Sequence, residues 1–216
     1  SFSGGIRLSA GTVQVGANTA LGTGTLTLQG GRVSSDSTTA RAMANGFVLS
    51  GTVTLGDLIN SGSLSFAGAG SIAASSVLSV NSAVLVSGSL SGTAPLVKEG
   101  AAELTLSGSN TFSGATTVNQ GTLTLAGGNA LANASSLTLG SVATLNLASS
   151  EEIGSLAGAG AVNLRGNTLT ISGTAATVFN GVLSGSGALV KTGSSDFTLS
   201  GSNTFNGGVV LGSGTL

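Results

Sequence analysis

The stretch LVKTGSSDFTLSGSNTF, Leu189–Phe205, nearly repeats a string found 93 positions earlier, LVKEGAAELTLSGSNTF at Leu96–Phe112. Extended to residues 89–123 and 182–216, the two copies are identical at 19 of 35 positions. A partial copy covers residues 1–28. Such internal repetition is typical of folds in which each structural unit packs only against its neighbours.

Within the copies, apolar and polar residues alternate over short runs such as TLTL (Thr122–Leu125) and DFTL (Asp196–Leu199). This alternation places every second side chain on the same face of a β-strand. The runs end in Gly, Ser or Asn, which tolerate tight turns. The sequence therefore predicts an all-β fold built from short strands.

A β-sandwich and a β-solenoid both fit short strands, and two features favour the solenoid. One is the self-similarity. The other is the scarcity of aromatic residues, 3% of the chain, because a two-sheet core usually takes several large rings. Coils of about 20–24 residues would give roughly ten coils stacked about 4.8 Å apart. We predict one β-helix over residues 1–216, with Leu104 and Leu199 in corresponding inward rows.

The composition excludes several classes of function. Only 6% of residues are charged and the net charge is -1, so no basic patch is available for nucleic acid. No run of 18 apolar residues occurs that could cross a membrane as a helix. His and Cys are absent, which removes the usual transition-metal ligands and nucleophile–base pairs. We predict no catalytic, cofactor-binding or metal-binding residues.

The repeated SGSNTF is expected to form a corner of the coil. Asn110 and Asn203 would adopt a turn conformation or bond an amide of the adjacent coil. Phe112 and Phe205 would cap the inner row beside that corner. Phe2 occupies the matching place at the start of the chain.

Two lysines also correspond between the copies. Lys98 and Lys191 each lie five positions before an acid, Glu103 or Asp196. We interpret them as surface ion pairs near a corner, with a ligand contact as the alternative. The two acids would then belong to one structural column on the surface.

Residues 30–46, GGRVSSDSTTARAMANG, interrupt the alternation and contain two of the four arginines and the only Met. We predict a lateral loop here, with a short helix in TTARAMANG that ends at Gly46. The predicted contact residues of this loop are Arg32, Asp36 and Arg41.

Two further patterns, an adjacent pair of acids and a set of Thr-x-Thr pairs, suggest catalysis and ice binding, but the residue spacing argues against both. Glu151 and Glu152 are adjacent, so on a strand they point to opposite faces and do not form a general acid–base pair. A solvated turn is their expected location. Four Thr-x-Thr pairs, which begin at Thr25, Thr52, Thr122 and Thr168, suggest an ice-binding ladder, but their spacing is irregular.

The motifs SGSGALVKTG, FTLSGSNTF and GSGTL in Val182–Leu216 resemble the passenger-associated strand repeat of autotransporters, the type V secreted surface proteins of Gram-negative bacteria. Residues 89–123 match again through LVKEG, LTLSGSNTF and QGTLTL, although Ala94 and Pro95 depart from the second copy. The resemblance implies a right-handed parallel β-helix, displayed outside the cell by a membrane barrel that this chain lacks. The chain is accordingly expected to be an excerpt of a longer passenger.

The leading functional hypothesis is a structural and adhesive segment of a surface-displayed passenger, a stalk for adhesion, aggregation or display. Its partners would be further copies of itself or a ligand on a host or cell surface. It would act at the cell surface or after release, without a cofactor. The alternative is a carbohydrate-active β-helix enzyme, and a minor alternative is an ice-binding solenoid.

Overall fold

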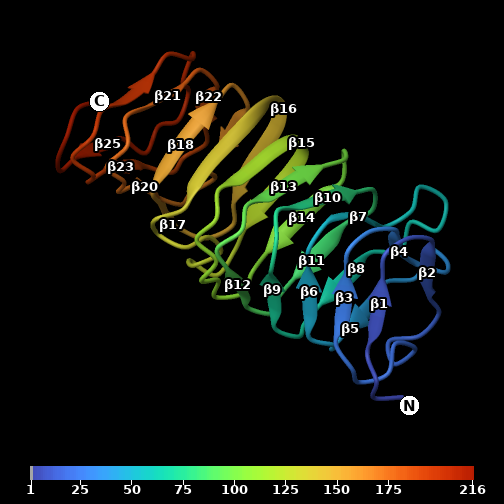
Figure 1. The fold of residues 1–216 in the computed structure, drawn as a ribbon. Coiled ribbons are helices and arrows are strands. Elements are labelled where there is room, and N and C mark those ends of the chain that lie inside the picture. The colour runs from blue at the N-terminus through green and yellow to red at the C-terminus, as the bar shows by residue number, and fades with distance from the viewer. Residues whose placement is uncertain (1) are drawn as a thin grey trace.

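The short alternating runs form 25 strands, which wind into an elongated parallel β-solenoid of about ten turns (Figure 1). The computed structural model describes residues 2–216. The described part contains no helix, and so none that is long and apolar enough to span a membrane. The two ends of the chain lie at opposite ends of the rod. The prediction of an all-β solenoid of roughly ten coils is confirmed.

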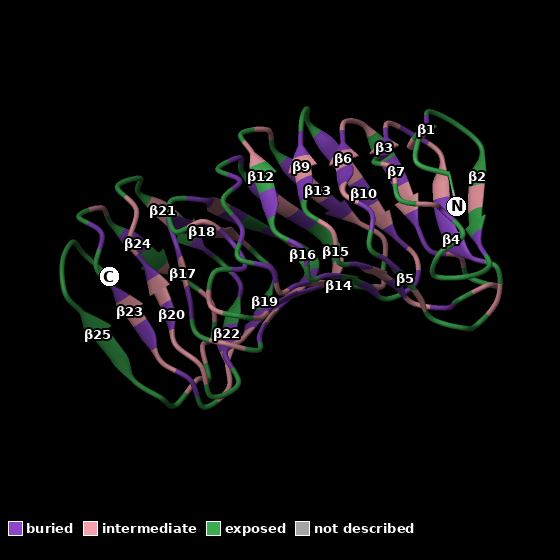
Figure 2. Cartoon of the chain, turned by 90° about the horizontal axis from the view of Figure 1, so that it is seen from below, coloured by how far each residue is buried: buried purple, intermediate pink, exposed green. Residues whose placement is uncertain are grey.

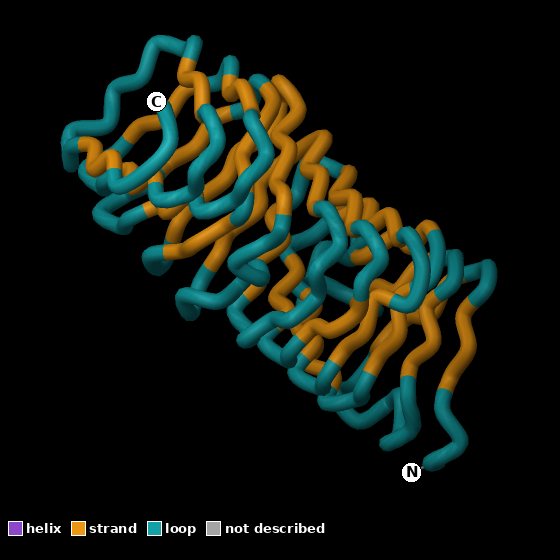
Figure 3. Tube along the Cα trace, turned by 60° about the vertical axis from the view of Figure 1, so that its left-hand side comes forward, coloured by secondary structure: helices purple, strands orange, loops and turns teal. Residues whose placement is uncertain are grey.

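Each coil presents three faces, and strands of successive coils pair in parallel along each face (Figure 3). The first face is interrupted between Gly92 and Glu151, where two coils cross it without a strand. Its strands are β1 (Ile6–Leu8), β3 (Leu26–Leu28), β6 (Phe47–Leu49), β9 (Gly70–Ile72), β12 (Leu90–Gly92), β17 (Glu151–Ile153), β20 (Leu169–Ile171), β23 (Leu189–Lys191) and β25 (Val209–Leu211).

The second face carries ten strand segments in unbroken pairing. They are β2 (Thr12–Val15), β4 (Arg32–Ser35), β7 (Thr52–Leu55), β10 (Ser76–Val80), β13 (Leu96–Glu99), the first halves of β15 (Thr116–Leu125) and β16 (Ser136–Leu147), β18 (Ser155–Gly158), β21 (Thr177–Phe179) and β24 (Phe197–Leu199).

The third face is joined to the second because β15 and β16 run through the corner between them. Its strands are β5 (Arg41–Met43), β8 (Leu64–Phe66), β11 (Val84–Val86), β14 (Glu103–Leu106), the second halves of β15 and β16, β19 (Ala161–Asn163) and β22 (Val182–Ser184).

The core is a set of aliphatic columns inside the coils. Buried residues recur in coil after coil along the rod (Figure 2). On the third face, register stacks Val84 on Leu104, Leu104 on Leu123, and Leu123 on Leu145, all of them buried. One coil advances the chain by about 20 residues, with extremes of 17 between Thr144 and Ala161 and 25 between Thr52 and Val77. Because the interior is narrow, Leu, Val and Ile fill it with few rings.

The two sequence copies do not lie on the same faces of the rod. Leu104 is on the third face and Leu199 is on the second, so the expected corresponding rows are wrong. Five coils of about 20 residues take about 100 residues, and the offset of 93 falls short by about one third of a coil. The two copies therefore form similar strands and corners, but the second copy is rotated about the rod axis by one face relative to the first.

Residues 30–46 are part of the coils. The strand β4 pairs with β2 and β7, and β5 pairs with β8, so the predicted helix and most of the predicted lateral loop are wrong. Residues 36–40 alone connect the two strands. Backbone pairing with neighbouring coils outweighs the weak local helical pattern, because β4 pairs on both sides and β5 pairs on one.

Candidate contact surface

One loop projects from the side of the rod near its N-terminal end (Figure 1). It comprises residues 56–63 between β7 and β8, and we call it the 56–63 loop. Leu58 and Ile59 at its tip are 81% and 84% exposed, the two highest values among the exposed large hydrophobic residues. The two adjacent exposed aliphatic side chains make this loop a candidate contact surface.

The base of the 56–63 loop is held by hydrogen bonds. The Asp57 carboxylate accepts from the backbone N–H of Ile59 at 2.8 Å and of Asn60 at 3.2 Å, and forms an ion pair with Arg32. The backbone N–H of Gly62 donates to the Ser37 carbonyl at 3.0 Å. The conformation that presents Leu58 and Ile59 is therefore preorganised.

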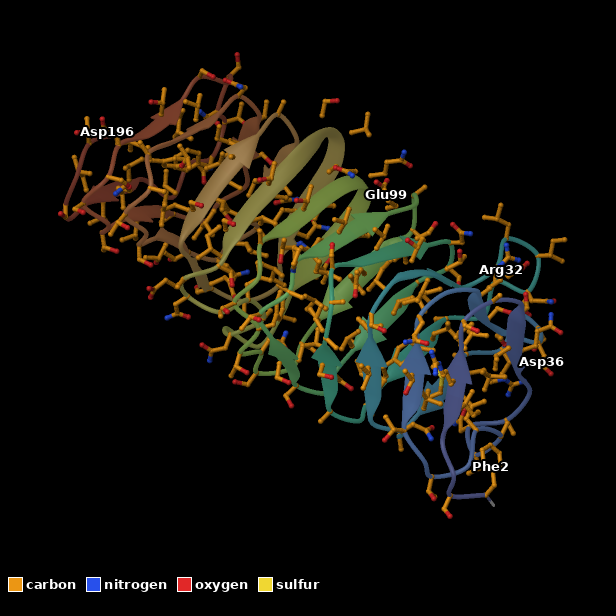
Figure 4. All side chains as sticks on the ribbon, viewed as in Figure 1. Phe2, Arg32, Asp36, Glu99 and Asp196 are labelled. Carbon is orange, nitrogen blue, oxygen red and sulfur yellow. The ribbon has the colours of Figure 1, made fainter. Side chains whose placement is uncertain are left out.

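The three contact residues predicted from the sequence, Arg32, Asp36 and Arg41, lie beside this loop, and two of them are labelled in Figure 4. Arg41 donates to Asp36 at 2.6 Å and to the Val15 carbonyl at 2.9 Å. These charges hold neighbouring coils and loops together.

Hydrogen bonding sets the charge state of both acids. The pKa of Asp36 is lowered chiefly by the hydrogen bond from Arg41. The pKa of Asp57 is lowered by the N–H groups of Ile59 and Asn60 and then by Arg32. Both carboxylates stay ionised at neutral pH, which keeps the base of the loop intact.

Lys98 and Lys191 are buried, at 1% and 0% exposure, so the expected surface ion pairs are wrong. The ion pairs of the described residues are Arg32–Asp57 and Arg41–Asp36. The Lys98 ammonium donates to the carbonyls of Gly100 at 2.8 Å and Gln120 at 2.9 Å, in its own coil and the next. Lys191 donates to the Gly193 carbonyl. Lys98 therefore links its own coil to the next, whereas Lys191 bonds within its own coil.

Asn110 joins three successive coils. Its side chain accepts from the Leu90 N–H at 2.7 Å and donates to the Ala130 carbonyl at 2.7 Å. Asn203 accepts from the Leu183 N–H at 2.8 Å in the same way. Both residues thus contact the amide of the adjacent coil.

The phenylalanines that follow these corners differ in burial. Phe112 is fully buried, Phe205 is half-buried against the core, and Phe2 is exposed. The equivalence of the three positions in the sequence therefore does not extend to their packing.

Glu103 and Asp196 do not form one surface column. Glu103 pairs in register with Thr122 on the third face, whereas Asp196 bridges Thr215 along the second. Their separation has the same origin as that of the two leucines, namely the rotation of one repeat relative to the other.

Glu151 is buried at 3% exposure, so the expected solvated turn is wrong for this residue. One carboxylate oxygen accepts from the Leu131 N–H at 2.7 Å, and the other has no partner among the described residues. Burial raises the pKa of Glu151, and the N–H groups of Leu131 and Ala130 partly offset this. The half-buried Glu152 points to the opposite face, so the two acids do not form a catalytic pair.

Replacing Glu151 with Gln is expected to stabilise the fold by about 1 kcal/mol at pH 7, because it removes a buried charge and keeps the acceptor for Leu131. The pKa of Glu151 is higher in the folded state than in the unfolded state. Between these two pKa values the folded state binds more protons, so the free energy of unfolding falls as the pH rises through this interval. Urea unfolding at pH 4 and pH 7 should show the gain at pH 7 only. Glu152→Gln is the control, and an equal gain from it would contradict this account.

The Thr-x-Thr pairs are distributed over all three faces. Thr27 and Thr170 lie on the first face, Thr52 on the second and Thr122 on the third. The four pairs therefore share no flat plane, which an ice-binding ladder requires.

The 56–63 loop is a feature that the sequence did not predict. Its signal was the string GDLINSG, in which an aliphatic pair stands between two glycines without the alternation of a strand. Asp followed by a short turn is a common Asx-turn pattern, and it could have indicated the loop.

Comparisons with known proteins agree with this architecture. A family model described as the passenger-associated-transport-repeat matches residues 1–15, 96–125 and 189–216. The adhesin BmaC autotransporter of Brucella suis biovar 1 (strain 1330) is 38% identical over 172 residues, which cover 77% of this chain. The matched region spans 5% of the length of that protein. No solved structure matches the chain. The chain is thus an autotransporter passenger β-helix that carries passenger-associated transport repeats and is distantly homologous to the BmaC adhesin.

Proposed function

We propose that the chain is a stalk segment that extends an adhesive or self-associating passenger from the cell surface. The observation that carries this proposal is the continuous parallel stacking of about ten coils along one axis. Such a rod resists bending because every coil is hydrogen-bonded to both neighbours. The adhesin name of the relative adds support. Display at a Gram-negative outer membrane, or release from it, belongs to the same proposal.

The proposed contact surface is the 56–63 loop together with residues 30–46, including Arg32, Asp36 and Arg41. Leu58 and Ile59 are the anchors, because their aliphatic side chains gain most when removed from water. The partner is a ligand on a host or cell surface, or another copy of the passenger.

The double change Leu58→Ser and Ile59→Ser is expected to reduce attachment at least tenfold without changing thermal stability, since neither side chain packs against the core. Bacteria displaying the intact passenger would be counted on cultured epithelial cells and followed by sedimentation for aggregation. Val142→Ser is the matched control, because Val142 is 70% exposed elsewhere on the rod.

The outcomes of this experiment separate the two parts of the proposal. Unchanged attachment and aggregation in the double variant would remove the 56–63 loop as the contact surface. Equal attachment by bacteria with and without the passenger would remove the adhesive function itself.

A further inference from the structure

A groove crosses the rod where successive corners between the first and second faces differ in length. The strand β17 passes into β18 through one residue, Gly154, whereas five residues separate β20 from β21 in the next coil. In the preceding coil the chain turns sharply, and the N–H of Ser135 donates to the Ala132 carbonyl at 2.7 Å. The middle corner is therefore recessed between two longer ones.

A hydrogen bond that skips a coil confirms this recess. The Ser172 hydroxyl lies 3.5 Å from the carbonyl oxygen of Asn133, which is 39 residues earlier and two coils away. The hollow has a volume of about 500 Å³ and adjoins a second of about 300 Å³, and both are lined by Asn133 and Glu152. These volumes fall in the range of small-molecule sites.

The lining of the larger hollow combines small apolar groups with hydrogen-bonding groups. Ala134, Ala175 and glycine backbone supply flat apolar surface, and Asn133, Ser172 and Thr174 supply an amide and two hydroxyls. A pyranose ring presents C–H groups on its faces and hydroxyls around its edge. It matches such a lining, since both donors and acceptors are present.

The charge of the groove restricts the ligand. Glu152 lines both hollows, Glu151 lines the smaller one, and no Lys or Arg lines either of them within the described residues. An anionic ligand such as a uronic acid, a sulfated sugar or a phosphate would be repelled. The charge of the lining therefore favours a neutral ligand over an anionic one.

The two acids of β17 differ in their relation to the groove, because Glu151 faces the interior and Glu152 faces outward. One carboxylate oxygen of Glu151 is buried without a hydrogen-bond partner among the described residues, on the inward face that it shares with Ile153. Its other oxygen is held by the Leu131 N–H. The groove therefore presents one open carboxylate, that of the half-buried Glu152, which fits binding without hydrolysis.

We propose that this groove, formed by residues 133–136, 152–155 and 172–175, binds a neutral saccharide unit. It would give the rod a second attachment point, far along its axis from the 56–63 loop. The inference deepens the proposed adhesive function by naming a ligand class, and it can be measured on the chain alone.

The test uses the 216-residue chain and three probes, namely maltotriose, the trimer of N-acetylglucosamine and trigalacturonate. Saturation-transfer NMR is expected to detect at least one neutral trimer and not trigalacturonate. The variant Asn133→Ala with Thr174→Val should weaken binding at least tenfold, and both side chains are exposed, so the fold is spared. Thr27→Val, in a separate polar hollow of about 380 Å³ at the N-terminal end, should bind like the parent chain.

Each contrary result has a distinct meaning. Binding of neither neutral trimer, preference for trigalacturonate, or full binding by the double variant would overturn the saccharide site. Binding that requires added Ca²⁺ would replace it with a cation-mediated site. None of these results bears on attachment by displayed bacteria, so failure of the groove is distinguishable from failure of the adhesive function.

Discussion

The change Gly181→Ala is expected to destabilise the rod by about 4 kcal/mol or more, which is a large loss for a single methyl group. A Cβ at this position would lie 1.8 Å from the Gly160 carbonyl oxygen, which belongs to the coil below. Gly201 stands in the same relation to Gly181, so the clash occurs within a column of glycines. The coils would have to separate, because the obstructing atom is backbone and cannot rotate away.

Gly166→Ala is the matched control. The nearest atom to its new Cβ would be the Ser186 hydroxyl oxygen at 3.7 Å, an ordinary contact. Unfolding would be followed by circular dichroism, since the chain has no Trp or Tyr for fluorescence. Gly166→Ala should change the free energy of unfolding by less than about 0.5 kcal/mol. Equal stability of the two variants would show that coil spacing at this corner is not set by glycine.

The sequence contained enough to predict the fold class because solenoid packing is local. Alternation such as that in Leu104 and Leu106 specifies which side chains point inward, and this needs only the period of a strand. The rotation of the second sequence copy by one face relative to the first could not be predicted from the sequence. It depends on the ratio of the 93-residue offset to the coil length, and coils vary from 17 to 25 residues.

The candidate surfaces were less accessible to sequence reasoning. A charged residue such as Lys98 is buried only rarely, so its interpretation as a surface residue followed the usual preference. Its ammonium group instead donates to the carbonyl oxygens of Gly100 and Gln120, which belong to two coils and come together only in the folded chain. The groove likewise arises from the difference between neighbouring corners, such as the single Gly154 and residues 172–176. Such differences become apparent only when coils are aligned in register.

Replacing Lys98 with Met is expected to cost about 3 kcal/mol of unfolding free energy at pH 7. Methionine retains most of the buried hydrocarbon but leaves the carbonyls of Gly100 and Gln120 without a donor. A buried acceptor without a partner costs about 1–3 kcal/mol, and relief of the ammonium's own burial offsets part of the total. Arg7→Met removes the same charge from an exposed side chain and should be nearly neutral.

The pH dependence of the free energy of unfolding shows whether Lys98 acts through its ammonium group or only through its buried hydrocarbon. Burial lowers the pKa of Lys98 to about 8, and the Glu99 carboxylate partly counteracts this. Between about pH 8 and the unfolded value of 10.5, the folded state binds fewer protons than the unfolded state, so stability contributed by this group rises with pH. Urea unfolding at pH 7 and pH 9.5 should show that rise in the parent chain and in Arg7→Met, and lose it in Lys98→Met. A Lys98→Met chain with parental stability and the same pH slope would mean that the ammonium does not hold the two coils together.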